Sequence, residues 1–117
     1  MKISVTKLFE FEAAHHLPNY DGACANLHGH TYKLEVEVIG HVALESGMVE
    51  DFSLLKKAVK ELVIDKYDHC NLNDWFHMPT AENMVIEIFN ILRKSYNGMV
   101  TRVRLWETST SYAEVKE

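Results

Sequence analysis

The sequence predicts an α+β fold in which two helices cover one face of a four-stranded antiparallel sheet. Two long segments near the start alternate between apolar and polar residues, and two shorter alternating segments lie near the end. Between these pairs, apolar residues recur twice at helical spacing. The order ββααββ is typical of helices packed on the apolar face of a sheet. The 117 residues suit one domain, residues 1–117, with one modest core.

The first two strands are expected over residues 3–15 and 28–39. One side of the first segment is mostly apolar, with Lys7 as the exception, and carries Ile3, Val5, Phe9, Phe11 and Ala13. The second segment alternates more cleanly, with one side formed by His28, His30, Tyr32, Leu34, Val36 and Val38. Period two indicates strands with one covered face. Strands of this length leave sheet edges that oligomerisation often closes.

The first helix is expected to begin near Phe52, with Asp51 as its N-cap. Its apolar stripe consists of Phe52, Leu55, Val59, Leu62 and Val63. The stripe fades near Asp65, and residues 66–79, rich in Asp and Asn, are interpreted as a loop.

The second helix is expected to begin after Thr80, a suitable N-cap, and Gly98 is placed to end it. Residues 99–107 alternate and predict a third strand. A Ser/Thr turn then leads to a short last strand, at about residues 112–115.

Composition excludes several classes of function. The net charge of −5 does not suggest a surface for nucleic acid. No apolar run approaches the roughly 18 residues that a membrane span needs. The first residues lack the apolar region of a signal peptide, and two cysteines do not make a disulfide framework. We therefore expect a cytoplasmic protein with reduced thiols.

Three histidines predict a metal site. His15 ends the first strand and His28 begins the second, so an antiparallel hairpin places them side by side. His28 and His30 are two residues apart and point to one face, whereas His16 points the other way. Three neutral imidazoles suit zinc and leave a fourth position for substrate or water. The alternative is a group of hydrogen-bonded histidines at a strand end, and carboxylates are candidate outer partners of the imidazoles.

Cys24 lies in the loop between the first two strands, four residues before His28. A thiolate near a metal can act as a base or nucleophile. Cys24 could equally be a fourth zinc ligand that closes a structural site, or an inert thiol. The spacing does not separate these alternatives.

Other polar residues are weaker candidates. Asp68 precedes His69 and could orient its imidazole for proton transfer, although a turn residue before a solvent-facing histidine is the simpler interpretation. Glu107 ends the apolar side of the third strand, where a carboxylate either reaches solvent or accepts hydrogen bonds from a ligand with paired donors. Capping alone explains Thr80, although main-chain N–H groups at that helix start could meet a ligand.

Several short motifs occur together in order and cover nearly the whole chain. They are Phe11-Glu12-Ala13-Ala14-His15, Cys24 with Leu27-His28-Gly29-His30, Asp51-Phe52, Asp68-His69, Leu72-Asn73-Asp74, Pro79-Thr80-Ala81-Glu82-Asn83 and Trp106-Glu107-Thr108. With these motifs the sequence resembles the 6-pyruvoyl-tetrahydropterin synthase / 6-carboxy-tetrahydropterin synthase family. The resemblance implies the tunnelling fold (T-fold), in which two trimers stack into a homohexamer with active sites between subunits.

The resemblance also implies roles for the site residues. One zinc ion per subunit would lie on His15, His28 and His30, and the substrate would be 7,8-dihydroneopterin triphosphate. Cys24 would act as general base or acid, with Asp68 and His69 of a neighbouring subunit as its proton-transfer partner. Glu107 would anchor the pterin ring, with Thr80 nearby.

Two reactions share this family's site. The compact loop from Pro18 to Cys24 and the form Cys-x-x-Leu-His-Gly-His resemble the bacterial type. That type is a lyase of queuosine biosynthesis that forms 6-carboxy-5,6,7,8-tetrahydropterin, acetaldehyde and triphosphate. The alternatives are a pyruvoyl synthase that releases triphosphate only, a non-catalytic zinc or pterin-binding module, and another T-fold enzyme such as an aldolase.

Overall fold

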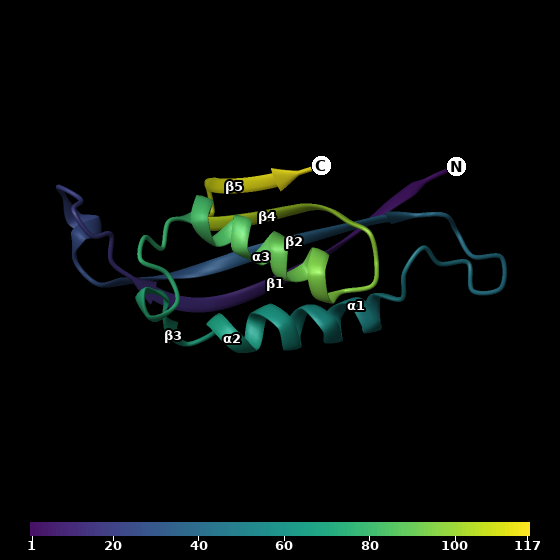
Figure 1. Cartoon of the computed structure of the whole chain (residues 1–117), viewed down its shortest axis with the longest axis horizontal. Helices are drawn as coiled ribbons and strands as arrows, with labels where there is room; N and C mark the ends of the chain where they lie inside the picture. Colours follow the sequence, from purple (N-terminus) through teal and green to yellow (C-terminus); the bar gives the residue numbers. More distant parts are fainter.

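The computed structural model describes residues 1–117 and shows an elongated molecule built around a long β-hairpin (Figure 1). Both hairpin strands have the predicted positions to within one residue. The elements are β1 (Ile3–His15), β2 (His28–Gly40), α1 (Phe52–Val59), α2 (Asp65–Tyr67), β3 (Cys70–Asn71), α3 (Ala81–Ser95), β4 (Val100–Thr108) and β5 (Ser111–Lys116).

The sheet has five strands in the order β3-β1-β2-β4-β5, so the prediction of four strands is wrong by one. The four expected strands are all antiparallel to their neighbours, whereas β3 runs parallel to β1 and pairs only with Ala13 and Ala14. A strand of two residues is too short to show an alternating pattern. It forms because the chain before it binds β1, as described below for Asp68 and His69.

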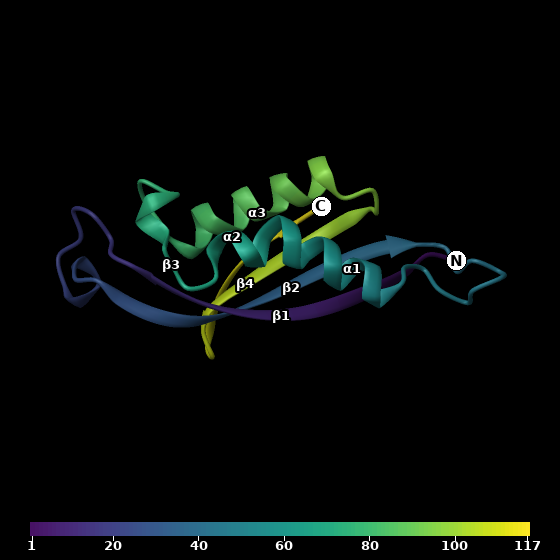
Figure 2. The ribbon, with the colours of Figure 1, turned by 90° about the horizontal axis from the view of Figure 1, so that it is seen from below.

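The helices lie on one face of the sheet, and the core fills the space between these layers (Figure 2). Along β2, Tyr32, Leu34 and Val36 are completely buried at period two, as the alternation predicts. The core continues into the helices through Leu55, Val59, Val63, Met84, Val85, Ile88 and Leu92. Phe52 is the exception in the expected stripe, with 49% of its surface exposed, because it lines an open groove at the edge of this core.

The first helical segment extends past Asp65 to Tyr67, which corrects its predicted end. Residues Lys60–Ile64 form a π-helical turn between α1 and α2. Spacing of four residues along this segment keeps Val59, Val63 and Tyr67 buried. The beginning of the segment is as predicted, since the Asp51 carboxylate accepts a hydrogen bond from the Ser53 N–H at 2.7 Å.

The helix α3 begins as predicted but ends earlier. The Thr80 hydroxyl accepts a hydrogen bond from the Asn83 N–H at 3.2 Å, which confirms the N-cap. The helix ends at Ser95, and Gly98 lies beyond it without a left-handed backbone. Glycine fits at this position because a Cβ atom would lie 2.5 Å from the Tyr96 ring. No helix of the structure is both long and apolar enough to cross a membrane.

Candidate metal centre and active site

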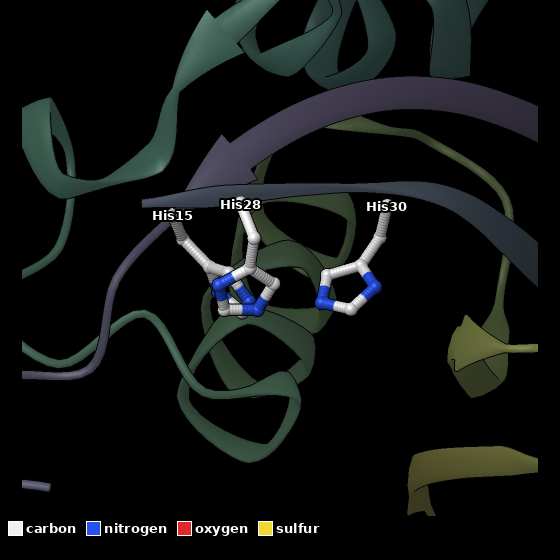
Figure 3. A group of neighbouring side chains, drawn as sticks. All are labelled: His15, His28 and His30. Carbon is white, nitrogen blue, oxygen red and sulfur yellow. The ribbon is translucent and has the colours of Figure 1, made fainter. Parts of the chain in front are cut away.

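Three imidazoles converge at the end of the β1–β2 hairpin (Figure 3). His15 and His28 are directly opposite each other in the strand register, and His30 is opposite Ala13. One nitrogen atom from each ring lies within 4.8 Å of the corresponding atoms of the other two rings. The period of the strands therefore produces the clustering that the sequence predicts.

Main-chain carbonyls fix the orientation of two of these rings. The His15 Nδ1 lies 2.7 Å from the Pro79 carbonyl oxygen, and the His28 Nδ1 lies 2.7 Å from that of Asn26. Each Nδ1 must carry a proton to donate these bonds, which leaves the lone pair on Nε2. The outer partners of these two rings are thus carbonyls, not the carboxylates that the sequence suggested.

Two of the imidazole nitrogens are buried without a hydrogen-bond partner, namely His15 Nε2 and His30 Nε2. Buried polar atoms are normally paired, so each of these atoms calls for a ligand. Burial lowers the pKa of His30, partly opposed by the Glu107 carboxylate, and so favours the neutral ring. Neutral imidazoles with free lone pairs fit zinc, which accepts three protein ligands in catalytic sites.

Glu107 approaches this centre from the end of β4. Its Oε1 lies 3.2 Å from His30 Nε2 and 3.9 Å from His15 Nε2. The same residue lines a cavity of about 670 Å³ between the start of α3 and strand β5. Thr80 lies next to the Pro79 carbonyl, and its hydroxyl is used as the cap of α3. The structure therefore places Glu107 between the three imidazoles and a cavity.

Cys24 lies in a 3-10 turn of the loop that joins β1 to β2. Its carbonyl accepts a hydrogen bond from the Leu17 N–H at 2.8 Å, and its side chain is partly exposed. The thiol is not a member of the group of converging ligand atoms. The group of converging ligand atoms therefore comes from three histidines alone. It does not include the Cys24 sulfur, which the sequence offered as an alternative fourth ligand.

Asp68 and His69 are attached to the outer edge of β1. The Asp68 carboxylate lies 3.0 Å from His69 Nδ1 and accepts a hydrogen bond from the Glu12 N–H at 2.9 Å. That N–H is the main reason why the pKa of Asp68 is lowered. The His69 N–H donates to the Glu12 carbonyl, and its backbone is left-handed with a φ of 59°. Its imidazole is exposed and lines a cleft that also contains His30.

A long hairpin that carries three converging imidazoles, with helices on one face of its sheet, defines the molecule as a T-fold protein with a candidate metal centre. A sequence model described as 6-pyruvoyl tetrahydropterin synthase matches residues 4–117. The chain therefore belongs to the 6-pyruvoyl tetrahydropterin synthase family, as the motifs predicted, and is an enzyme of the tetrahydropterin synthase type.

Individual relatives agree with this assignment. The chain is 38% identical to 6-carboxy-5,6,7,8-tetrahydropterin synthase of Haemophilus influenzae, over 97% of this chain and 98% of the relative. It is 39% identical to dihydroneopterin monophosphate aldolase of Pyrococcus furiosus, over 92% and 91% of the two chains. The structure of 6-pyruvoyl tetrahydropterin synthase from Caenorhabditis elegans superimposes with a TM-score of 0.90 and 30% identity, covering 100% of this chain and 96% of the other.

Proposed function

We propose that this protein is a zinc-dependent lyase that converts 7,8-dihydroneopterin triphosphate and water to 6-carboxy-5,6,7,8-tetrahydropterin. The other products are acetaldehyde and triphosphate, and the product would serve as a precursor of queuosine. The observation that carries the proposal is the group of three converging imidazoles, two of which, His15 and His28, keep the Nε2 lone pair free because Nδ1 faces a carbonyl. It occurs in a chain that matches a bacterial 6-carboxy-5,6,7,8-tetrahydropterin synthase along almost its whole length.

The three histidines would hold the zinc ion, one per subunit. When bound, zinc polarises hydroxyl oxygens of the substrate side chain and acidifies the C–H groups beside them. Glu107 would accept hydrogen bonds from the amino-pyrimidine edge of the pterin ring, because its carboxylate lines the neighbouring cavity. Thr80, next to Pro79, would lie near the ring.

Cys24 and His69 would transfer protons to and from the substrate side chain. Asp68 holds the His69 ring through Nδ1, so that the Nε2 atom of this exposed imidazole is left for proton transfer. The two groups lie on different segments, at the β1–β2 loop and at the outer edge of β1. They can therefore approach a substrate from different sides.

We propose a homohexamer, arranged as a dimer of trimers, with active sites between subunits. Beyond Ala13 and Ala14, the outer edge of β1 has no neighbouring strand, and the outer edge of β5 has none. Free edges of this length can pair with another chain, and oligomerisation is one way to cover them. The exposed His69 side chain on the β1 edge would then face the metal centre of a neighbour.

The identity of the product is the decisive test. Zinc-loaded protein is incubated with dihydroneopterin triphosphate, and the products are identified by mass spectrometry. A carboxypterin with acetaldehyde is expected, whereas a pyruvoyl product would assign the reaction named for the Caenorhabditis elegans relative. Intact substrate would indicate a module that binds without catalysis.

The Pyrococcus furiosus relative makes an aldolase the second candidate. A parallel incubation with dihydroneopterin monophosphate separates this alternative. Retro-aldol cleavage would leave a hydroxymethyl group on the pterin ring, whereas the proposed lyase should not consume the monophosphate at a comparable rate.

A further inference from the structure

The side chain of Asn73 holds both main-chain groups of His16, the residue directly after His15. Its Oδ1 accepts a hydrogen bond from the His16 N–H at 2.9 Å, and its Nδ2 donates to the His16 carbonyl at 3.0 Å. These two bonds copy the pattern by which a neighbouring strand would pair with β1. The amide therefore continues the edge pairing of β1 beyond the two residues that pair with β3.

Asn73 is itself held firmly. It lies in the 3-10 turn Leu72–Asp74, and its own N–H donates to the Asn71 side chain at 3.0 Å. Leu72, the first residue of this turn, is completely buried in the core. The amide thus extends from a turn that is fixed to the core, and it can determine the position of the chain that it binds.

The residues on both sides of His16 connect it to the proposed active site. His15 precedes it, and the following residue, Leu17, donates its N–H to the Cys24 carbonyl at 2.8 Å. The hydrogen bonds of Asn73 therefore act where the metal-binding strand ends and the loop of Cys24 begins. The His16 imidazole is not in the group of converging rings, and its Nε2 lies 3.5 Å from Asn73 Nδ2.

We propose that Asn73 is a positioning residue, whose amide fixes the direction of the His15 backbone and the base of the Cys24 loop. This inference rests on the proposed metal site. Only an amide suits the position, because it must accept from an N–H and donate to a carbonyl at the same time. An aspartate would keep the acceptor but would face the His16 carbonyl with a second oxygen.

Three variants test the role of Asn73. Asn73→Ala removes both bonds, and Asn73→Asp removes only the donor. Arg93→Ala is the matched control, because Arg93 donates to the Val100 carbonyl and pairs with Glu117 near the other end of β4. It weakens the fold by the loss of hydrogen bonds without touching the hairpin end.

Zinc affinity is measured by competition with a chromophoric chelator, and the d–d spectrum of the cobalt(II) form reports the coordination geometry. We expect Asn73→Ala to weaken zinc binding by about tenfold to a hundredfold, as for other residues that orient ligands from outside. Asn73→Asp should show a smaller loss. In the metal-free protein, the His16 and Leu17 amides should exchange hydrogen faster in Asn73→Ala but not in Arg93→Ala. The His16 amide should stay protected in Asn73→Asp, because the aspartate keeps the acceptor.

The possible outcomes are distinct. If the wild-type protein does not bind zinc, the proposed function fails together with this inference. If the wild type binds zinc and the folded Asn73 variants lose no more affinity than Arg93→Ala, the positioning role alone is overturned. Where Asn73→Ala does not fold, the same comparison is made with Asn73→Asp. A loss of affinity with an altered cobalt spectrum supports the proposal.

Discussion

Removal of zinc should lower the free energy of unfolding, because one imidazole nitrogen then remains buried and unpaired. His15 Nε2 has no hydrogen-bond partner and His15 is only 1% exposed, whereas His30 Nε2 lies 3.2 Å from the Glu107 carboxylate. A buried polar atom without a partner costs about 1–3 kcal/mol. A bound metal ion satisfies His15 Nε2, and its removal should restore this penalty.

The expected change in melting temperature follows from the length of the chain. At an unfolding entropy of about 2.1 cal/mol/K per residue, a penalty of about 1–3 kcal/mol in 117 residues corresponds to a decrease of roughly 4–12 °C. The assay is thermal unfolding of metal-free and zinc-loaded protein, followed by circular dichroism. Protein concentration is held constant, because the melting temperature of an oligomer depends on it.

Controls distinguish a specific metal site from a general effect of salt. Magnesium should not restore stability, because it prefers oxygen ligands over imidazole. His41→Ala should respond to zinc like the wild type, since His41 lies outside the histidine group and its imidazole is hydrogen-bonded to the Met1 carbonyl. Equal melting temperatures of the metal-free and zinc-loaded forms would refute the reasoning, as would equal stabilisation by magnesium.

Three further perturbations test separate parts of the structure. Cys24→Ala should keep zinc and the fold but lower turnover about a hundredfold or more, whereas Cys70→Ala should keep full activity; full turnover by the Cys24 variant would remove its assigned role. Because the pKa of Asp68 is lowered in the folded protein, its ionised carboxylate stabilises the fold, fully so above the ordinary pKa. This contribution is lost as the pH falls through the lowered pKa. In urea, metal-free Asp68→Asn should therefore have a lower free energy of unfolding than the wild type at neutral pH. The two free energies should converge well below pH 3.9, the approximate ordinary pKa of aspartate, and a difference that stays constant with pH would contradict this. Asp51→Ala should lower the free energy of unfolding, measured in urea, by about 1 kcal/mol, because α1 loses its N-cap. Asp65→Ala, at an exposed position, should lower it by about 0.5 kcal/mol or less. Equal losses in the two variants would contradict the capping role.

The parts of the fold that were predictable from the sequence are those with a strict period. Alternation placed β1 and β2 correctly, and the same alternation placed His15, His28 and His30 on one face. A hairpin then brings the end of one strand to the start of the other, whatever the rest of the chain does. The geometry of the three imidazoles therefore followed from local pattern and a single topological assumption.

The partners of these imidazoles were not predictable in the same way. The carbonyls of Pro79 and Asn26 orient two of the rings, and every residue has such a carbonyl. No sequence signal distinguishes the one that is used. The same holds for β3, whose two residues depend on the attachment of Asp68 and His69 to Glu12. The position of Cys24 depends on its loop, which has no period.

The hydrogen bond between His15 and Pro79 also has a consequence for the order of folding. These residues are 64 positions apart, so their contact forms only after a long segment of chain has closed. The three histidines themselves precede Pro79 in the chain and leave the ribosome before it. A nascent hairpin can therefore gather its imidazoles before Pro79, whose carbonyl orients His15, has been synthesised. We expect zinc binding to gain its full affinity late, when the segment before α3 docks.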